Sequence, residues 1–75
     1  MSDNIIRFSE KELLLLGSLN TERTQVNFNE CIFYKKASFS QKQIAEALKI
    51  CQELSRKNQI SLLVKHEDRV SVWVE

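Results

Sequence analysis

Three adjacent side chains, His66, Glu67 and Asp68, are the groups in this sequence that most resemble catalytic or metal-binding residues. A histidine held by a carboxylate can act as a general base, and the same residue types ligate metals. The three are consecutive in a predicted tight turn, however, so their side chains diverge into solvent instead of converging on one point. The lone Gly17 cannot build a glycine-rich phosphate loop. The sequence therefore predicts a protein that is not an enzyme and has no metal site or cofactor.

A cluster of aromatic and basic residues suggests a different chemistry. Aromatic rings on a sheet stack on nucleobases, and neighbouring lysines neutralise phosphates. The net charge of only +1, from eleven basic and ten acidic residues, gives no general attraction to nucleic acid. A small nucleic-acid-binding regulator is thus the alternative hypothesis. Its expected contact residues are Phe33, Tyr34, Lys35, Lys36, Lys65 and Arg69.

The only tryptophan, Trp73, lies in the final stretch VSVWVE. If this stretch is a strand, Val70, Val72 and Val74 share one face, and Trp73 lies on the other. Leu63 is expected beside Trp73 on that second face. A large aromatic on a small polar-rimmed surface is typical of an interface hot spot. The stretch also lacks the proline or lysine that blunts an edge strand, so it could pair with another chain, including a second copy.

These observations predict a non-enzymatic protein–protein interaction or regulatory module. Its partner is another protein or a second copy in a homodimer, through the sheet face or edge that contains Trp73. A competing interpretation keeps the chain monomeric and lets the leucines at 13–16 cover the tryptophan from inside. The candidate interface consists of Leu63, Trp73, Phe33 and Val74.

Length and composition predict one small globular domain over residues 1–75. The chain is 43% hydrophobic and 28% charged, which is ordinary for a folded protein and too apolar for a disordered one. Cys31 and Cys51 are too far apart in sequence for a close-spaced metal or redox pair. Two reduced, buried thiols are expected, with a disulfide between them as the alternative. The N-terminal residues lack the apolar core of a signal peptide, and a cytoplasmic location without a membrane anchor is expected.

A long amphipathic helix over about 40–57 is the clearest expected element. Ser40 and Gln43 have the spacing of a capping box, and Asn58 is a suitable helix stop. Apolar residues recur behind the cap at steps of three and four, which predicts one buried stripe. The stripe consists of Ile44, Ala47, Leu48, Cys51 and Leu54.

A β-hairpin over about 59–75 is expected next. Its apolar residues share one face only if Val64 lies opposite Val70, which leaves a three-residue loop over 66–68. Asp68 is then the candidate for a left-handed backbone conformation.

The N-terminal half has weaker signals. Ser9 and Glu12 form a second potential capping box, which predicts a short helix over about 10–19 after an extended stretch over 4–8. Residues 24–36 are rich in β-branched and aromatic side chains and read as one strand, broken or bulged near its middle, or as two. The fold class is therefore α+β, with a small antiparallel sheet of three or four strands.

Overall fold

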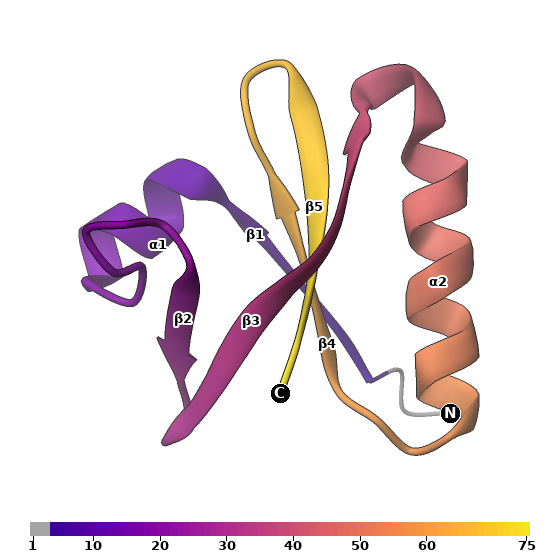
Figure 1. Cartoon of the computed structure of the whole chain (residues 1–75), viewed down its shortest axis with the longest axis horizontal. Helices are drawn as coiled ribbons and strands as arrows, with labels where there is room; N and C mark the ends of the chain where they lie inside the picture. Colours follow the sequence, from indigo (N-terminus) through magenta and orange to yellow (C-terminus); the bar gives the residue numbers. More distant parts are fainter. Residues whose placement is uncertain (1–3) are drawn as a thin grey trace.

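Five strands form one curled, mixed sheet in the computed structural model, which describes residues 4–75 (Figure 1). The spatial order is β1-β4-β5-β3-β2, with β1 parallel to β4 and every other neighbouring pair antiparallel. The α+β class is confirmed. The antiparallel sheet of three or four strands is wrong, because the N-terminal stretch joins it as a parallel strand. The strands are β1 (Ile5–Ser9), β2 (Gln25–Phe28), β3 (Cys31–Ser40), β4 (Ser61–Lys65) and β5 (Arg69–Val74).

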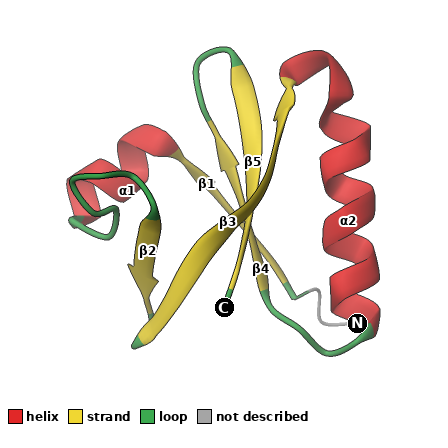
Figure 2. Cartoon of the chain, viewed as in Figure 1, coloured by secondary structure: helices red, strands yellow, loops and turns green. Residues whose placement is uncertain are grey.

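Two helices cover the sheet, one on each face (Figures 1 and 2). They are α1 (Glu10–Leu16) and α2 (Ile44–Arg56). Each helix seals its own cluster of buried side chains. The α1 cluster comprises Leu13, Val26, Phe33, Leu62, Val64 and Trp73. The α2 cluster comprises Ala47, Cys51, Leu54, Leu63, Val70 and Val72.

The β4–β5 register differs by one residue from the expected one. Val64 lies opposite Ser71 instead of Val70, so Leu62 and Trp73 face each other. The expected register assumed that only one face of the hairpin is buried. Because α1 and α2 bury both faces, the alternation of apolar residues does not select a register.

The turn between β4 and β5 is correspondingly tighter. The His66 N–H donates to the carbonyl of Arg69 at 2.8 Å, which leaves Glu67 and Asp68 as the two turn residues. The expected three-residue loop is therefore wrong, and Asp68 does not adopt the left-handed conformation.

Strand β5 lies in the middle of the sheet, between β4 and β3. The expectation that the terminal strand is a sheet edge is wrong. Its second neighbour is β3, because Cys31–Ser40 forms one long strand that pairs with β5 from Tyr34 to Ser40. The break foreseen near the middle of 24–36 is a tight turn in which Asn29 and Glu30 have φ of 54° and 66°.

Helix α1 begins as its sequence predicts and ends earlier. Ser9 Oγ accepts from the Glu12 N–H at 3.2 Å, and Glu12 Oε1 accepts from the Ser9 N–H at 3.0 Å, so the capping box is confirmed. The helix stops at Leu16, because Gly17 adopts a left-handed conformation with φ of 67°. The residues just beyond it pair with β2, where the Asn27 N–H donates to the Ser18 carbonyl at 2.7 Å.

Helix α2 begins later than expected and ends at its predicted stop. Ser40 is the last residue of β3 and makes no side-chain cap, so the predicted capping box there is wrong. A 3₁₀ turn, Gln41–Gln43, intervenes before the helix. At the other end Asn58 has φ of 60°, and the Gln59 N–H returns to the carbonyl of Leu54 at 3.0 Å, as in a Schellman motif.

The two cysteines lie in different clusters. Cys51 belongs to the α2 cluster, whereas Cys31 packs, half-buried, against the α1 cluster on the other face. No disulfide joins them, because the sheet separates them.

Candidate functional site

Trp73 is buried within the chain, with 1% of its surface exposed. It packs in the α1 cluster, and Leu13 is the one residue of the leucine run that reaches it there. The interpretation in which the N-terminal leucines cover the tryptophan is therefore correct for Leu13 and wrong for the other three leucines.

The predicted interface residues do not form one surface. Phe33 is 2% exposed beside Trp73, and Leu63 is 6% exposed on the opposite face, against α2. Only Val74 is partly accessible. The sheet separates Leu63 from Trp73 because the hairpin register is shifted by one residue.

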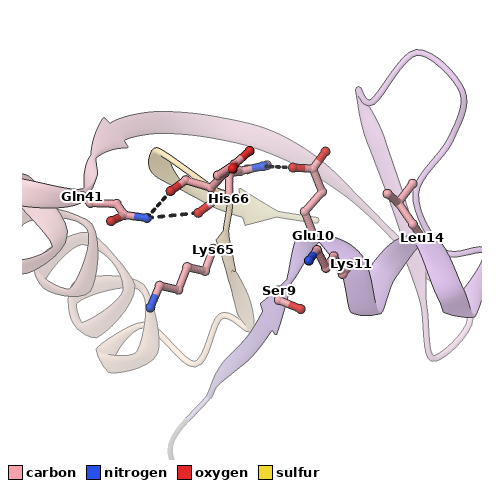
Figure 3. A pocket seen from close by; sticks show the side chains of 8 residues that line it. Ser9, Glu10, Lys11, Leu14, Gln41, Lys65 and His66 are labelled. Atoms are coloured by element: carbon pink, nitrogen blue, oxygen red, sulfur yellow. Dashed lines mark hydrogen bonds and ion pairs between the residues drawn. The ribbon is translucent and has the colours of Figure 1, made fainter.

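A chain of hydrogen bonds joins Trp73 to α1. The Trp73 indole N–H donates to Ser71 Oγ at 2.7 Å, and Ser71 Oγ lies 2.7 Å from His66 Nε2. His66 Nδ1 lies 2.8 Å from Glu10 Oε2, in the first turn of α1 (Figure 3). We call these four residues, Trp73, Ser71, His66 and Glu10, the relay. It connects the core of β5, the β4–β5 turn and α1.

The direction of each bond follows from the groups present. An indole N–H can only donate, so Ser71 Oγ is the acceptor there. A neutral His66 that donates from Nδ1 to the Glu10 carboxylate has Nε2 available to accept the Ser71 hydroxyl proton. The order serine, histidine, carboxylate is that of a nucleophilic triad. Ser71, however, is fully buried, and its oxygen already accepts from Trp73, so no substrate atom reaches it in this conformation.

The prediction that His66 is a solvated loop residue is wrong. Its side chain is only 10% exposed, and Gln41 holds the adjacent backbone. Gln41 Nε2 donates to the carbonyls of His66, at 3.1 Å, and of Glu67, at 2.8 Å (Figure 3). A hollow of about 460 Å³ opens beside the relay. It is lined by Ser9, Glu10, Lys11, Leu14, Gln41, Lys65, His66 and Glu67.

Glu10 links the first turn of α1 to two other parts of the chain, His66 and Arg23. Its second carboxylate oxygen, Oε1, pairs with Arg23 Nη1 at 2.9 Å. The hydrogen bond from His66 is the main cause that lowers the pKa of Glu10. Burial opposes this shift, and the charges of Arg23, Arg69 and, when it is protonated, His66 add to it.

A lowered carboxyl pKa makes the relay sensitive to acid. The stabilisation from ionised Glu10 is complete above its ordinary pKa of about 4.5 and is lost as the pH falls through the lower folded-state value. We expect the free energy of unfolding of the wild type to fall with acidification below about pH 4.5 more steeply than that of Glu10→Gln. Denaturant titrations at several pH values, followed by Trp73 emission, measure both. Parallel pH profiles would contradict the role given to Glu10.

The last turn of α1 exposes three leucines, which we call the leucine face. Leu14, Leu15 and Leu16 are 50%, 88% and 63% exposed. Burial of Leu13 and the pairing of Glu10 fix the helix so that these residues point away from the core. The sequence predicts the four leucines as one covering group, whereas the structure divides them into one buried and three exposed residues. The capping box could have indicated this division, because it fixes where the helix begins and therefore which direction each leucine faces.

The alternative aromatic–basic surface is not assembled. Tyr34 is 49% exposed at one end of β5, where it pairs with Val74, whereas Arg69 pairs with Ser40 at the other end. Five strand steps separate these ends by about 16 Å. Phe33, the second aromatic, is in the core.

The two lysines that follow the aromatics on β3 do not restore the predicted surface. Lys35 Nζ lies 5.6 Å from the centroid of the Trp73 ring, and the pairing of β3 with β5 shifts register between Lys35 and Ala37, at Lys36. Lys65 is at the far end of the sheet, beside the β4–β5 turn. The structure therefore splits the six predicted contact residues into separate groups.

Comparisons with protein-family models, with curated proteins and with solved structures find no match to this chain. Within residues 4–75, no helix is long and apolar enough to cross a bilayer.

Proposed function

We propose that the protein is a non-enzymatic interaction module that self-associates through the leucine face. The observation that carries the proposal is the exposure of Leu14, Leu15 and Leu16 on a helix in which the preceding leucine, Leu13, is completely buried. Contiguous exposed apolar groups on a small protein mark interaction sites. The chain has two clusters of fully buried side chains, so the exposure of these leucines does not result from the lack of a hydrophobic core.

The shape of the leucine face favours a shallow partner surface. Successive helical residues are about 100° apart, so Leu14 to Leu16 spread over about 200° around the last turn. Binding in a groove needs anchors three or four residues apart on one side of a helix, and this helix is too short to supply them. Contact between the leucine faces of two copies, related by a two-fold axis, fits three leucines spread around the end of a short helix.

Charge also favours a second copy as the partner. Residues 13–21 contain no charged side chain, so two leucine faces can meet without like-charge repulsion. The net charge of +1 adds almost no long-range repulsion between copies. The relay fixes the helix before association, which lowers the entropy cost of binding.

The expected association is weak. The exposed portions of the three leucines amount to about two whole side chains per copy. At about 1.5–3 kcal/mol per side chain, complete burial on both copies would contribute roughly 6–12 kcal/mol, which is an upper limit because the leucines spread around the helix. Association costs about 4–15 kcal/mol in lost freedom of motion. The dimer is therefore expected at high micromolar protein concentration or above.

Leu15→Glu should abolish self-association, because it places a charge at the centre of the leucine face. Sedimentation equilibrium over a wide concentration range measures the effect. Ile60→Glu is the matched control, because Ile60 is also exposed, at 41%, but lies outside α1. The wild type and Ile60→Glu should show a mass that rises with concentration, and Leu15→Glu should remain monomeric.

A wild type that stays monomeric at millimolar concentration, or a dimer that tolerates Leu15→Glu, would refute the proposal. Retention of the monomer on oligonucleotides, falling steeply with salt, would instead support the alternative of nucleic-acid binding.

A further inference from the structure

Strand β1 is the open edge of the sheet on the side away from β2. Among the described residues no strand lies beyond it, and it pairs only with β4. The other edge differs, because β2 is covered by the residues that follow α1: the Asn20 N–H donates to the Gln25 carbonyl at 3.1 Å, and Leu19 bridges to Val26. An edge strand presents backbone groups that can pair with another extended chain.

The backbone of Arg7 points toward this open side. The Ser61 N–H donates to the Asn4 carbonyl at 3.0 Å, which fixes the phase of the parallel ladder. Because backbone groups of successive residues in a strand point to alternate sides, Ile6 and Phe8 bond to β4, and the N–H and C=O of Arg7 face outward.

An apolar groove of about 370 Å³ lies beside this edge, between β1 and the first half of α2. Its floor includes Leu63 and Val70, and Leu48 and the 40% exposed Ile44 form the α2 wall. Such a groove suits one large apolar side chain.

Positive charge borders the groove. Arg7 and Lys65 both line it, both are exposed, and neither has an ion pair among the described residues. Glu12 is the acidic residue on the rim, and its single negative charge leaves the two basic side chains in excess. The edge therefore favours an acidic partner. Antiparallel pairing with a second copy centred on Arg7 would place two arginines opposite each other, which is unfavourable.

We propose that the β1 edge binds an extended, acidic segment of a partner protein, which pairs antiparallel with the outward backbone N–H and C=O of Arg7. The residue opposite Arg7 is acidic, because its side chain lies on the same face as the Arg7 guanidinium. The partner residue two positions earlier lies beside Ser9, whose N–H is held by Glu12 and takes no part in the backbone pairing. This residue is large and apolar and enters the groove. The recognised pattern is thus an apolar residue, any residue, then Asp or Glu. This surface is separate from the leucine face, and its test is independent of self-association.

A fluorescein-labelled peptide, Thr-Val-Thr-Leu-Thr-Glu-Thr-Val-Thr, is the probe, and fluorescence anisotropy measures its binding to the full chain. We expect saturable binding that weakens at least about tenfold with Arg7→Glu. The same loss is expected when the peptide glutamate is replaced by lysine. Combining the two changes should restore binding, because the charges are complementary again. Lys57→Glu, beyond the far end of α2, makes the same charge change outside the groove and should leave the affinity unaltered.

A second variant tests the backbone contact. Arg7→Pro removes an outward N–H without removing a bond to β4, so it should abolish binding while Trp73 emission stays that of the folded chain. The proposal is overturned if no saturable binding occurs below about 1 mM. It is also overturned if Arg7→Glu and Lys57→Glu behave alike, or if the lysine peptide fails to bind Arg7→Glu.

Discussion

Replacing Leu13 by alanine should lower the free energy of unfolding by about 2–5 kcal/mol, because it opens a cavity in the α1 cluster. Leu13 has no exposed surface and packs in the cluster that contains Trp73 and Phe33. For a 75-residue domain this is a large fraction of the total stability. Guanidinium denaturation, followed by Trp73 emission, measures the change.

Leu15→Ala is the control from the same helix. Leu15 is 88% exposed, so its truncation should change the stability of the monomer by no more than about 0.5 kcal/mol. Both substitutions have the same helix propensity change and remove the same atoms. Equal losses for Leu13→Ala and Leu15→Ala would show that α1 does not dock as described.

Ser71→Ala should have the second largest effect, a loss of about 1–3 kcal/mol, because two buried partners lose their hydrogen bonds at once. The Trp73 indole N–H loses its acceptor, and His66 Nε2 loses its donor. Ser61 provides the matched control. It is equally buried, but its Oγ has no hydrogen-bond partner among the described residues, so Ser61→Ala should be neutral or stabilising.

A double-mutant cycle distinguishes the relay from simple loss of packing. Ser71→Ala and His66→Ala should be coupled by about 0.5–3 kcal/mol, since each removes the other's partner. The indole N–H proton resonance of Trp73 should also shift in Ser71→Ala. Additive stability changes would mean that the hydrogen bond between Ser71 and His66 does not form in solution.

Signals carried by neighbouring residues predicted the start of α1 and the end of α2, where nothing distant competed. Ser9 and Glu12 cap α1, and Asn58 ends α2, as their sequence spacing indicates. Ser40 has an equally good capping sequence with Gln43, but it is bound into the sheet opposite Arg69. The tertiary pairing of β3 with β5 decided against the local signal.

The strand register could not be read from alternation. Alternation indicates a register only where a strand has one apolar and one polar face. Strand β4 has the buried run Ser61 to Val64, with no polar side to place in solvent. The parallel position of β1 was equally invisible, because IIRFS is short and its partner lies more than 50 residues further along the chain.

The candidate site was only partly predictable for the same reason. The exposed leucines were noticed as a run, but which of them is buried depends on the docking of α1. Glu10 and His66 are 56 residues apart and meet only in the folded chain. Ser71 and Trp73 are close in sequence, yet their hydrogen bond becomes important only once both are buried.

The most direct test of the central claim is a filtered nuclear Overhauser experiment on a concentrated mixture of isotope-labelled and unlabelled copies. It records contacts between methyl groups of different molecules only. The account predicts intermolecular contacts among the methyl groups of Leu14, Leu15 and Leu16, which disappear on dilution and in Leu15→Glu. Intermolecular contacts from any other face, or none at millimolar concentration, would contradict the proposal that the leucine face joins two copies of this chain.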